Sequence, residues 1–399
     1  MKNMIFKKDE LRILWPFYLT DLIYGLSMII FPFMMIYFRN LGLSFFQISI
    51  LVGAYGIASF LFEIPTGAFA DGFSRKYSSL LGLFMGGVSL LLFAFTTNFY
   101  VMLLLWFLAG LSMTFVSGAF ESWVVDNLKE HKRKELQQEY FIKNYSLSSI
   151  GMIVAPLIGA FIIKNYSQSI LWIVSGFGFL IGAFILSLFA EELYKPKRLS
   201  VIKSLKNTWD NSKKGLKFSF SHRQVMLIIL GSVFVGMLLL GETGWQPLMV
   251  SLSMPQYSLG FVYSIVAVGW VLGPFVPKLF GKINVKKTVI IVTAFRMLLL
   301  FSVVLVHKPF FIIVAAILVF DQFFKAMSDP LLLSYIHKFI PTRIRATVIS
   351  IKSMLLQVVF ALTGLIAGVL QDAIGPAAVI SIGGLFGFFA IATFLKLKD

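Results

Sequence analysis

Residues 67–76 read Gly67-Ala-Phe-Ala-Asp71-Gly-Phe-Ser-Arg75-Lys76, a short polar stretch between two long apolar ones at 45–70 and 77–97. A helix needs about 20 apolar residues to cross the hydrocarbon of a bilayer. Both flanking runs are long enough, and only a few residues remain for the turn between them. The stretch therefore predicts a tight turn that joins two membrane-spanning helices.

The composition of the whole chain agrees with a membrane environment. Of the 399 residues, 58% are hydrophobic and 13% are charged, whereas a soluble domain carries about 25% charged residues. The mean hydropathy is +0.87. A chain with so few polar side chains cannot cover itself in water, so we expect lipid to be its solvent. No cysteine is present, which excludes disulfides and thiolate metal sites.

Apolar runs of spanning length recur along the chain. They predict an all-α membrane protein with twelve transmembrane helices, at residues 12–38, 45–70, 77–97, 99–126, 140–164, 168–190, 224–250, 257–280, 287–306, 309–337, 345–370 and 376–396. Only the segment 191–223 between them is long and polar. It divides the chain into an N-terminal six-helix bundle (1–190), a cytoplasmic basic linker (191–223) and a C-terminal six-helix bundle (224–399).

An internal echo favours two related halves. A glycine and a lysine nine residues apart follow the second predicted helix (Gly67, Lys76), and another such pair follows the eighth (Gly273, Lys282). The offset of 206 residues is about half the chain. Because repeated halves are common in transporters, we expect the two bundles to be pseudo-symmetric.

The basic residues predict the orientation. With the N-terminus inside, the inner loops hold 29 of the 35 Lys and Arg residues, and the outer loops hold three, Arg39, Lys164 and Lys308. Cytoplasmic loops carry an excess of basic residues, so both termini are predicted to be cytoplasmic. This placement also accounts for the net charge of +17, which faces anionic lipid. A nucleic-acid partner is not expected.

The turn at 67–76 has two interpretations. It can be a plain turn, in which Gly67 lets a neighbouring helix approach, Asp71 caps the next helix, and Arg75 and Lys76 stay in the cytoplasm. The order of its residues also closely resembles the loop 2–3 signature of the major facilitator superfamily. Gly67, Asp71, Arg75 and Lys76 carry this match.

The resemblance implies a conformational gate. In this family the Asp and the Arg of the signature lock the two lobes in the outward-open state, together with an acid at the cytoplasmic end of helix 4. Asp126 occupies that place, which implies a charge relay of Asp71, Arg75 and Asp126. Two positions depart from the family pattern, since Gly72 replaces a basic residue and Ser74 replaces a glycine.

The fifth predicted helix contains Gly151-Met-Ile-Val-Ala155-Pro156-Leu-Ile-Gly159-Ala160. This run is similar to the helix 5 antiporter motif of drug/proton exporters in the same family, with Ala155 and Ala160 in place of two glycines. A proline-kinked helix with small packing residues is the alternative interpretation.

Two further segments bear on the resemblance. Residues 341–347 also resemble members of the family. Many proton-coupled drug exporters of the family carry an arginine early in helix 4, four residues before a glycine. Here Trp106 stands four residues before Gly110, so that coupling scheme does not transfer to this chain.

Ionisable side chains inside a membrane mark functional sites by default. The resemblance implies that helices 1, 4, 7 and 10 line a central cavity, and six of eight such side chains lie on these helices. This favours a polar, water-filled path, and the surplus of acids favours cations and protons. The eight are Asp21, Glu63, Glu121, Glu242, Arg296, Asp321, Lys325 and Asp329.

Five of them are predicted substrate or proton residues with an open alternative. Asp21 and Glu121 lie in the cytoplasmic half of their helices, where burial disfavours the charged carboxylate and suits a proton carrier. Hydrogen bonding to neighbouring helices is their alternative role. Asp321, Lys325 and Asp329 share one helix face, so Lys325 can neutralise one acid and leave the other free. Their alternative is a self-satisfied ion network.

The remaining candidates are Glu242, Trp245, Glu63 and Arg296. Glu242 and Trp245 lie in residues 241–247, where two glycines and a proline predict a broken helix of the kind that often forms a binding site. A frayed helix end is the alternative. Glu63 lies two residues before a proline and can satisfy backbone groups that the proline frees. Arg296 can snorkel or pair with a carboxylate.

The leading functional hypothesis is a secondary active transporter that works by alternating access. We expect a proton-coupled exporter of a small lipophilic molecule, with cations favoured, in the cell (plasma) membrane. A nutrient or metabolite importer, a uniporter and a lipid or lysolipid flippase are the alternatives. No nucleophile–base pair, nucleotide loop or metal-ligand cluster indicates an enzyme, a cofactor or a metal. The expected partners are the substrate, protons and membrane lipid, and the family resemblance implies a monomer.

Overall fold

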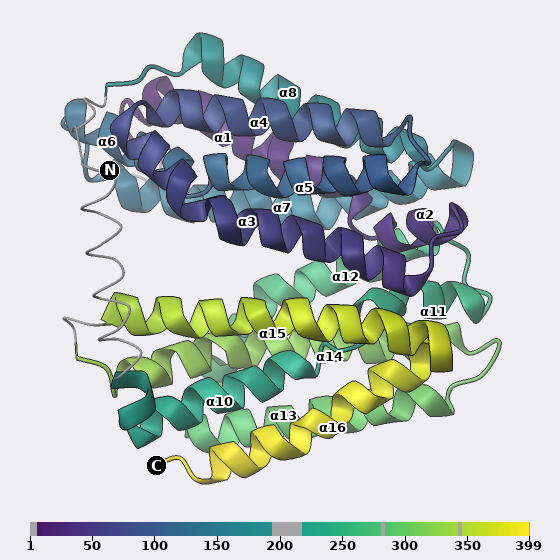
Figure 1. The fold of residues 1–399 in the computed structure, drawn as a ribbon. Helices are drawn as coiled ribbons and strands as arrows, with labels where there is room; N and C mark the ends of the chain where they lie inside the picture. The colour runs from purple at the N-terminus through teal and green to yellow at the C-terminus, as the bar shows by residue number, and fades with distance from the viewer. Residues whose placement is uncertain (1–5, 194–217, 281–283, 342–344, 399) are drawn as a thin grey trace. The chain divides into compact units, whose positions relative to one another are not determined.

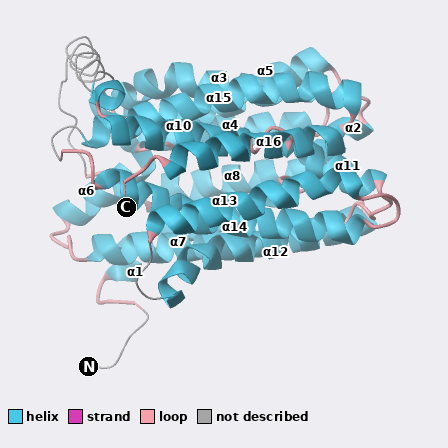
Figure 2. Ribbon diagram, turned by 90° about the horizontal axis from the view of Figure 1, so that it is seen from below, coloured by secondary structure: helices cyan, strands magenta, loops and turns pink. Residues whose placement is uncertain are grey.

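The structure of the chain is a computed structural model that describes residues 6–193, 218–280, 284–341 and 345–398. Every regular element in these ranges is a helix (Figures 1 and 2). Twelve helical stretches in them are long and apolar enough to cross a membrane, which is the predicted number. The chain is therefore an all-α, multi-pass membrane protein.

The first six spans are built from α1 (Glu10–Ser27), η1 (Met28–Ile30) and α2 (Met34–Asn40), then α3 (Phe45–Gly72), α4 (Arg75–Phe93), α5 (Phe99–Val116) with α6 (Ala119–Glu130), α7 (Leu136–Asn165) and α8 (Ser169–Phe189). The last six are α10 (Arg223–Met237), η2 (Glu242–Gly244) and α11 (Trp245–Ser251), then α12 (Ser258–Leu272) with η3 (Gly273–Phe280), α13 (Val285–Ser302) with η4 (Val303–Leu305), α14 (Phe311–His337), α15 (Arg345–Ile374) and α16 (Pro376–Leu395).

Three spans are interrupted near their middle. The break in the seventh span, between α10 and α11, falls at the glycines that predicted it. The breaks in the first span, after α1, and in the fourth span, between α5 and α6, were not predicted. Both unpredicted breaks lie beside the cavities described below.

The described helices pack into two compact units, which are considered separately. Unit 1 comprises Met1–Met34 and Leu51–Val201. Here α4 packs on α5 and α8, and α1 packs on α7 and α8. The approach of α4 to α8 is close, because a Cβ atom on Gly87 would lie 2.9 Å from the carbonyl oxygen of Gly176. Stacked rings of Phe93 and Trp172, with centroids 4.5 Å apart, fill its core.

Unit 2 comprises Met35–Ile50 and Ile202–Asp399. In it α13 packs on α14 and α16, α12 on α14, and α10 on α15 and α16. The early segment belongs here because Asp372 on α15 accepts hydrogen bonds from the backbone N–H groups of Phe45 and Phe46, both at 2.9 Å. A buried apolar cluster that includes Ile228 and Phe394 forms one end of this unit.

Candidate functional site

Two acids of unit 1 line one polar cavity of about 220 Å³. Asp21 comes from α1, and Glu121 comes from the first turn of α6. Asp21 is 9% exposed, whereas Glu121 is exposed, so the burial expected for both acids is found for Asp21 alone. The other polar side chains in the wall belong to Thr20, Tyr24, Ser117, Asn144 and Ser148. The structure thus brings together the two residues that the sequence predicted as proton carriers.

The break between α5 and α6 positions Glu121. Gly118 has a φ of +68°, a left-handed conformation that glycine adopts readily and other residues adopt at a cost. The chain turns there, and α6 begins at Ala119. Glu121 therefore lies in the first turn of a new helix, where the helix dipole favours a negative charge.

Asp21 is held by a row of side chains on α7. The hydroxyl of Tyr140 donates to Oδ2 of Asp21 at 3.2 Å, and the amide of Asn144 donates to that hydroxyl oxygen at 3.2 Å. Ser148 then donates to Asn144 at 3.2 Å. The three residues are spaced by four, so they share one face of α7. In the described ranges no basic side chain forms an ion pair with Asp21 or Glu121.

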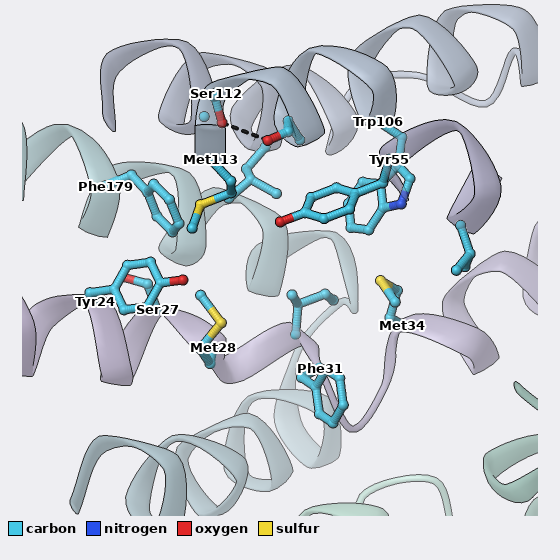
Figure 3. A pocket seen from close by; sticks show the side chains of 15 residues that line it. Tyr24, Ser27, Met28, Phe31, Met34, Tyr55, Trp106, Ser112, Met113 and Phe179 are labelled. Carbon is cyan, nitrogen blue, oxygen red and sulfur yellow. Dashed lines mark hydrogen bonds between the residues drawn. The ribbon is translucent and has the colours of Figure 1, made fainter. Parts of the chain in front are cut away.

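A second cavity of unit 1, of about 290 Å³, is lined almost wholly by apolar side chains. It shares Tyr24 and Met113 with the acidic cavity. Figure 3 shows aromatic rings and methionine sulfurs around one space, with Trp106, the residue four before Gly110, in its wall. The labelled residues are Tyr24, Ser27, Met28, Phe31, Met34, Tyr55, Trp106, Ser112, Met113 and Phe179.

The serines of this pocket are committed to the backbone. Ser27 donates to the carbonyl of Ile23, and Ser112 donates to that of Ala109, both at 2.7 Å. Their hydroxyl hydrogens therefore do not point to the pocket. The wall therefore offers a ligand mainly dispersion and ring contacts, and its polar groups toward the space are the hydroxyls of Tyr24 and Tyr55.

In unit 2 two of the predicted acids, Asp321 and Asp329, lie near bases. Arg296 on α13 donates to both carboxylate oxygens of Asp321 on α14, at 2.8 and 3.3 Å, and each side chain is 1% exposed. Lys325 lies 4.0 Å from Asp329. Arg296 thus pairs with a carboxylate, one of the two roles considered for it, and Lys325 lies near Asp329. The roles of Asp321, Lys325 and Asp329 in substrate or proton binding stay predictions.

Glu242 and Trp245 lie on either side of the boundary between η2 and α11. The side chain of Glu242 is exposed, whereas Trp245 is 2% exposed. Thr243 between them donates to Gln371 on α15 at 3.2 Å, and this bond ties the broken helix to its neighbour. Only Glu242 of the two candidates therefore presents its side chain to the surroundings.

The predicted gate residues come together at one end of unit 1. Arg75 donates to Asp71 at 3.1 Å and to the carbonyl of Ser122 at 3.1 Å, and it forms a close ion pair with Asp126. Lys129 donates to the other oxygen of Asp126 at 2.9 Å. The geometry of the implied charge relay is present, with Arg75 between the two acids.

Three details of the gate differ from the prediction. Asp71 does not cap α4, because it still belongs to α3, and Ser74 caps α4 by accepting from the N–H of Tyr77. Lys76 lies outside the relay, since its ammonium donates to carbonyls at the end of α8 at 2.6 and 3.0 Å. No described residue of unit 1 lies within 4 Å of a Cβ built on Gly67, so no helix of that unit makes the expected close approach there.

The small residues of the helix 5 motif pack on the first span. A Cβ on Gly151 would lie 2.6 Å from the Cα of Gly25 on α1, and one on Gly159 would lie 2.5 Å from the ring of Phe33. Pro156 is buried, and α7 continues through it. The motif therefore serves close packing of α7 inside unit 1.

Glu63 lies beside the break between α5 and α6. Its carboxylate accepts a hydrogen bond from Ser117 at 3.1 Å, and its side chain is exposed. Thr66, rather than Glu63, donates to nearby carbonyls, that of Phe62 at 2.7 Å and that of Thr114 at 3.0 Å. Among these contacts Glu63 forms no hydrogen bond with the backbone groups that the proline was expected to free.

Sequence reasoning missed one buried acid. Glu10 has no exposed surface and is bound by Lys143, by the hydroxyl of Tyr18 and by the backbone of Lys7. It was hidden in a terminal segment rich in lysine. Its spacing of eight from Tyr18 could have indicated that the two share a helix face.

Comparisons with known proteins agree with this fold. The family model described as the Major Facilitator Superfamily matches residues 17–358. The chain is 24% identical over 396 residues to YxaM of Bacillus subtilis, an uncharacterised MFS-type transporter, with 96% of each chain covered. It is 26% identical over 178 residues to the quinolone resistance protein NorA of Staphylococcus aureus, covering 44% of this chain and 42% of the relative.

Solved transporters share the fold at low identity. The nucleoside transporter NupG superposes with a TM-score of 0.73 at 16% identity, covering 98% of this chain and all of the other. A bacterial homologue of the human lysosomal transporter Spinster gives a TM-score of 0.71 at 13% identity, covering 96% of this chain and 95% of the other. These similarities establish the architecture. They do not identify the substrate, which has to be inferred from the residues of the site.

Proposed function

Because the chain belongs to the major facilitator superfamily, we propose that it is a proton-coupled exporter of a small lipophilic molecule, with cations favoured. It works by alternating access between two pseudo-symmetric six-helix halves. It is a monomer in the cell membrane, with both termini in the cytoplasm. The observation that carries the proposal is the pairing, inside unit 1, of an unneutralised acidic cavity with an apolar pocket that shares two of its lining residues.

The acidic cavity supplies the coupling. Asp21 and Glu121 face one space and form no ion pair with a base in the described part of the chain. Two ionised carboxylates in one cavity repel each other. A proton or a cation relieves that repulsion. Since both ligands neutralise the same acids, binding of one disfavours the other, and this competition is the basis of exchange.

The apolar pocket supports a lipophilic substrate. Its serines are bonded to backbone, and its wall is aromatic and methionine-rich. Methionine side chains adapt to ligands of different shape. A sugar or a peptide would leave polar groups unpaired in such a pocket, at a cost of about 1–3 kcal/mol for each group. The similarity to a quinolone resistance protein points the same way.

The relay of Asp71, Arg75 and Asp126 is assigned to the conformational cycle. Arg75 holds the ends of α3 and α6 together within unit 1. In the proposed cycle this arrangement is made in one state and weakened in the other. Replacing Asp71 by Asn should therefore slow transport and leave the fold intact, as measured by initial rates and by thermal unfolding.

The test is proton movement in proteoliposomes that enclose a pH-sensitive dye. Lipophilic cations, neutral lipophiles, sugars, nucleosides, amino acids and lysolipids are added in turn. We expect a pH change with lipophilic compounds alone, and its loss in the variant Asp21→Asn. Glu130→Gln is the matched control, because Glu130 is an exposed acid at the end of α6. Flux of sugars or nucleosides, or flux of lipophiles without proton movement, would contradict the proposal.

A further inference from the structure

The carboxylate of Glu10 is fully buried and belongs to neither cavity. Three donors hold it: the backbone N–H of Lys7 at 2.7 Å, the hydroxyl of Tyr18 at 2.8 Å and the ammonium of Lys143. Taking such a pair out of water is costly, and apolar residues in its place are often no less stable. Stability alone therefore does not explain the buried carboxylate of Glu10, and the residues in contact with it indicate another role.

Two aromatic rings connect Glu10 to the acidic cavity. Tyr18, whose hydroxyl donates to Glu10, stacks on Tyr140 with ring centroids 5.7 Å apart and an interplanar angle of 24°. The hydroxyl of Tyr140 donates to Oδ2 of Asp21. Tyr18 is 6% exposed and Tyr140 has no exposed surface, so neither ring can turn without moving its neighbours. Fixing Tyr18 thus fixes the donor that orients Asp21.

The same ion pair fixes the register of α1 on α7. Lys143 lies three residues after Tyr140 on α7, so both project from nearly the same face. It joins Glu10 at the start of α1, while the contact of Gly25 with Gly151 fixes the two helices farther along. Asp21 lies between these two points. Two fixed points on a pair of packed helices leave little freedom for rotation between them.

The charged and titratable groups around Asp21 are few. Tyr140 faces it from α7, and Glu121 lines the same cavity from α6. Tyr24 of α1 itself also lines that cavity, and α8, which packs on α1, carries no charged residue. A change in the hydrogen bond from Tyr140 should therefore register directly in the titration of Asp21.

We propose that Glu10 is a positioning residue, which sets the proton affinity of Asp21 through Lys143 and the stacked pair of Tyr18 and Tyr140. The inference rests on the proposed role of Asp21 as proton carrier. Tyr140 donates to the ionised form of Asp21, and a hydrogen bond to the charged form favours that form. Weakening any contact in the series from Glu10 through Tyr18 and Tyr140 should let Asp21 keep its proton to a higher pH.

The experiment is an infrared pH titration of the protonated carboxyl band in the purified full-length protein, with the band assigned by its loss in Asp21→Asn. Tyr140→Phe should move the midpoint up by about half to one pH unit. Tyr18→Phe and Glu10→Gln should move the midpoint in the same direction by about a few tenths of a pH unit. Glu10→Asp keeps the carboxylate and should return the midpoint most of the way to the wild-type value. Glu135→Gln, in the loop before α7, is the control with no shift.

The outcomes separate the two proposals. Unchanged midpoints in both Glu10→Gln and Tyr18→Phe would overturn the positioning role. Should Glu10→Gln fail to fold, Tyr18→Phe still tests it, because this variant keeps the stacked ring and removes one hydroxyl. Shifted midpoints together with liposomes that move lipophiles without protons would overturn the proposed function and leave the positioning role standing.

Discussion

Asp21 and Glu121 of unit 1 have different surroundings from Asp321 and Asp329 of unit 2. In unit 1, Asp21 and Glu121 line a cavity and meet no base within the described ranges. In unit 2, Asp321 is locked to Arg296 with both side chains 1% exposed, and Asp329 lies near Lys325. Two acids in each unit therefore have different chemical surroundings, although the sequence alone does not distinguish them. Acids without a partner can take up a proton, whereas neutralised ones hold helices together.

The difference explains why a count of charges is a poor guide to mechanism. Sequence places acids on spans of both halves, and membrane charges mark functional sites by default. The partner determines the role, and for Asp321 that partner is 25 residues away on another helix. The predictions below test the contrast between free and paired acids, beginning with the largest expected effect.

The first prediction breaks the buried pair of unit 2. Arg296→Met should destabilise the protein by about 3–5 kcal/mol, because it leaves the carboxylate of Asp321 buried and unpaired. Thermal unfolding of purified protein in detergent measures this effect. The double variant Arg296→Met with Asp321→Leu removes both charges and should recover most of the loss. A single variant as stable as wild type would show that the pair is not buried as described.

The second prediction concerns the turn that positions Glu121. Gly118→Ala places a side chain at φ +68°, which should cost about 1–2 kcal/mol of stability and lower the rate of proton-coupled transport. Gly53→Ala is the matched control, because Gly53 lies inside α3 and no described residue lies within 4 Å of a Cβ built on it. Equal behaviour of the two variants in unfolding and transport assays would remove the role assigned to the turn.

The sequence predicted the number of spans from local composition, and the motif at 67–76 with the family resemblance predicted that Asp71, Arg75 and Asp126 lie together. It missed the break at Gly118 because a serine and a glycine inside an apolar run differ little from ordinary small packing residues. The sequence analysis assigned the cap of α4 to Asp71. It could not show that α3 extends to Gly72, so that Ser74 is the residue that caps α4. The apolar pocket was not predictable, because its walls come from five spans and share no motif.

The third prediction addresses the partly exposed pair of unit 2. Lys325 and Asp329 are 4.0 Å apart, with side chains 31% and 55% exposed. Pairs of this kind contribute about 0–1 kcal/mol, so Lys325→Met should change the unfolding free energy by less than about 1 kcal/mol and leave proton coupling intact. Loss of coupling in this variant would show that Lys325 and Asp329 of unit 2 take part in proton transfer, and would contradict the assignment of that role to unit 1.

Proton release on binding tests the central claim most directly. A lipophilic cation is mixed with purified protein in a weakly buffered solution that contains a pH indicator, and protons released per bound ligand are counted. We expect release by wild type and by Asp329→Asn, and no release by the double variant Asp21→Asn with Glu121→Gln. Undiminished release by that double variant, with loss of release in Asp329→Asn, would contradict it.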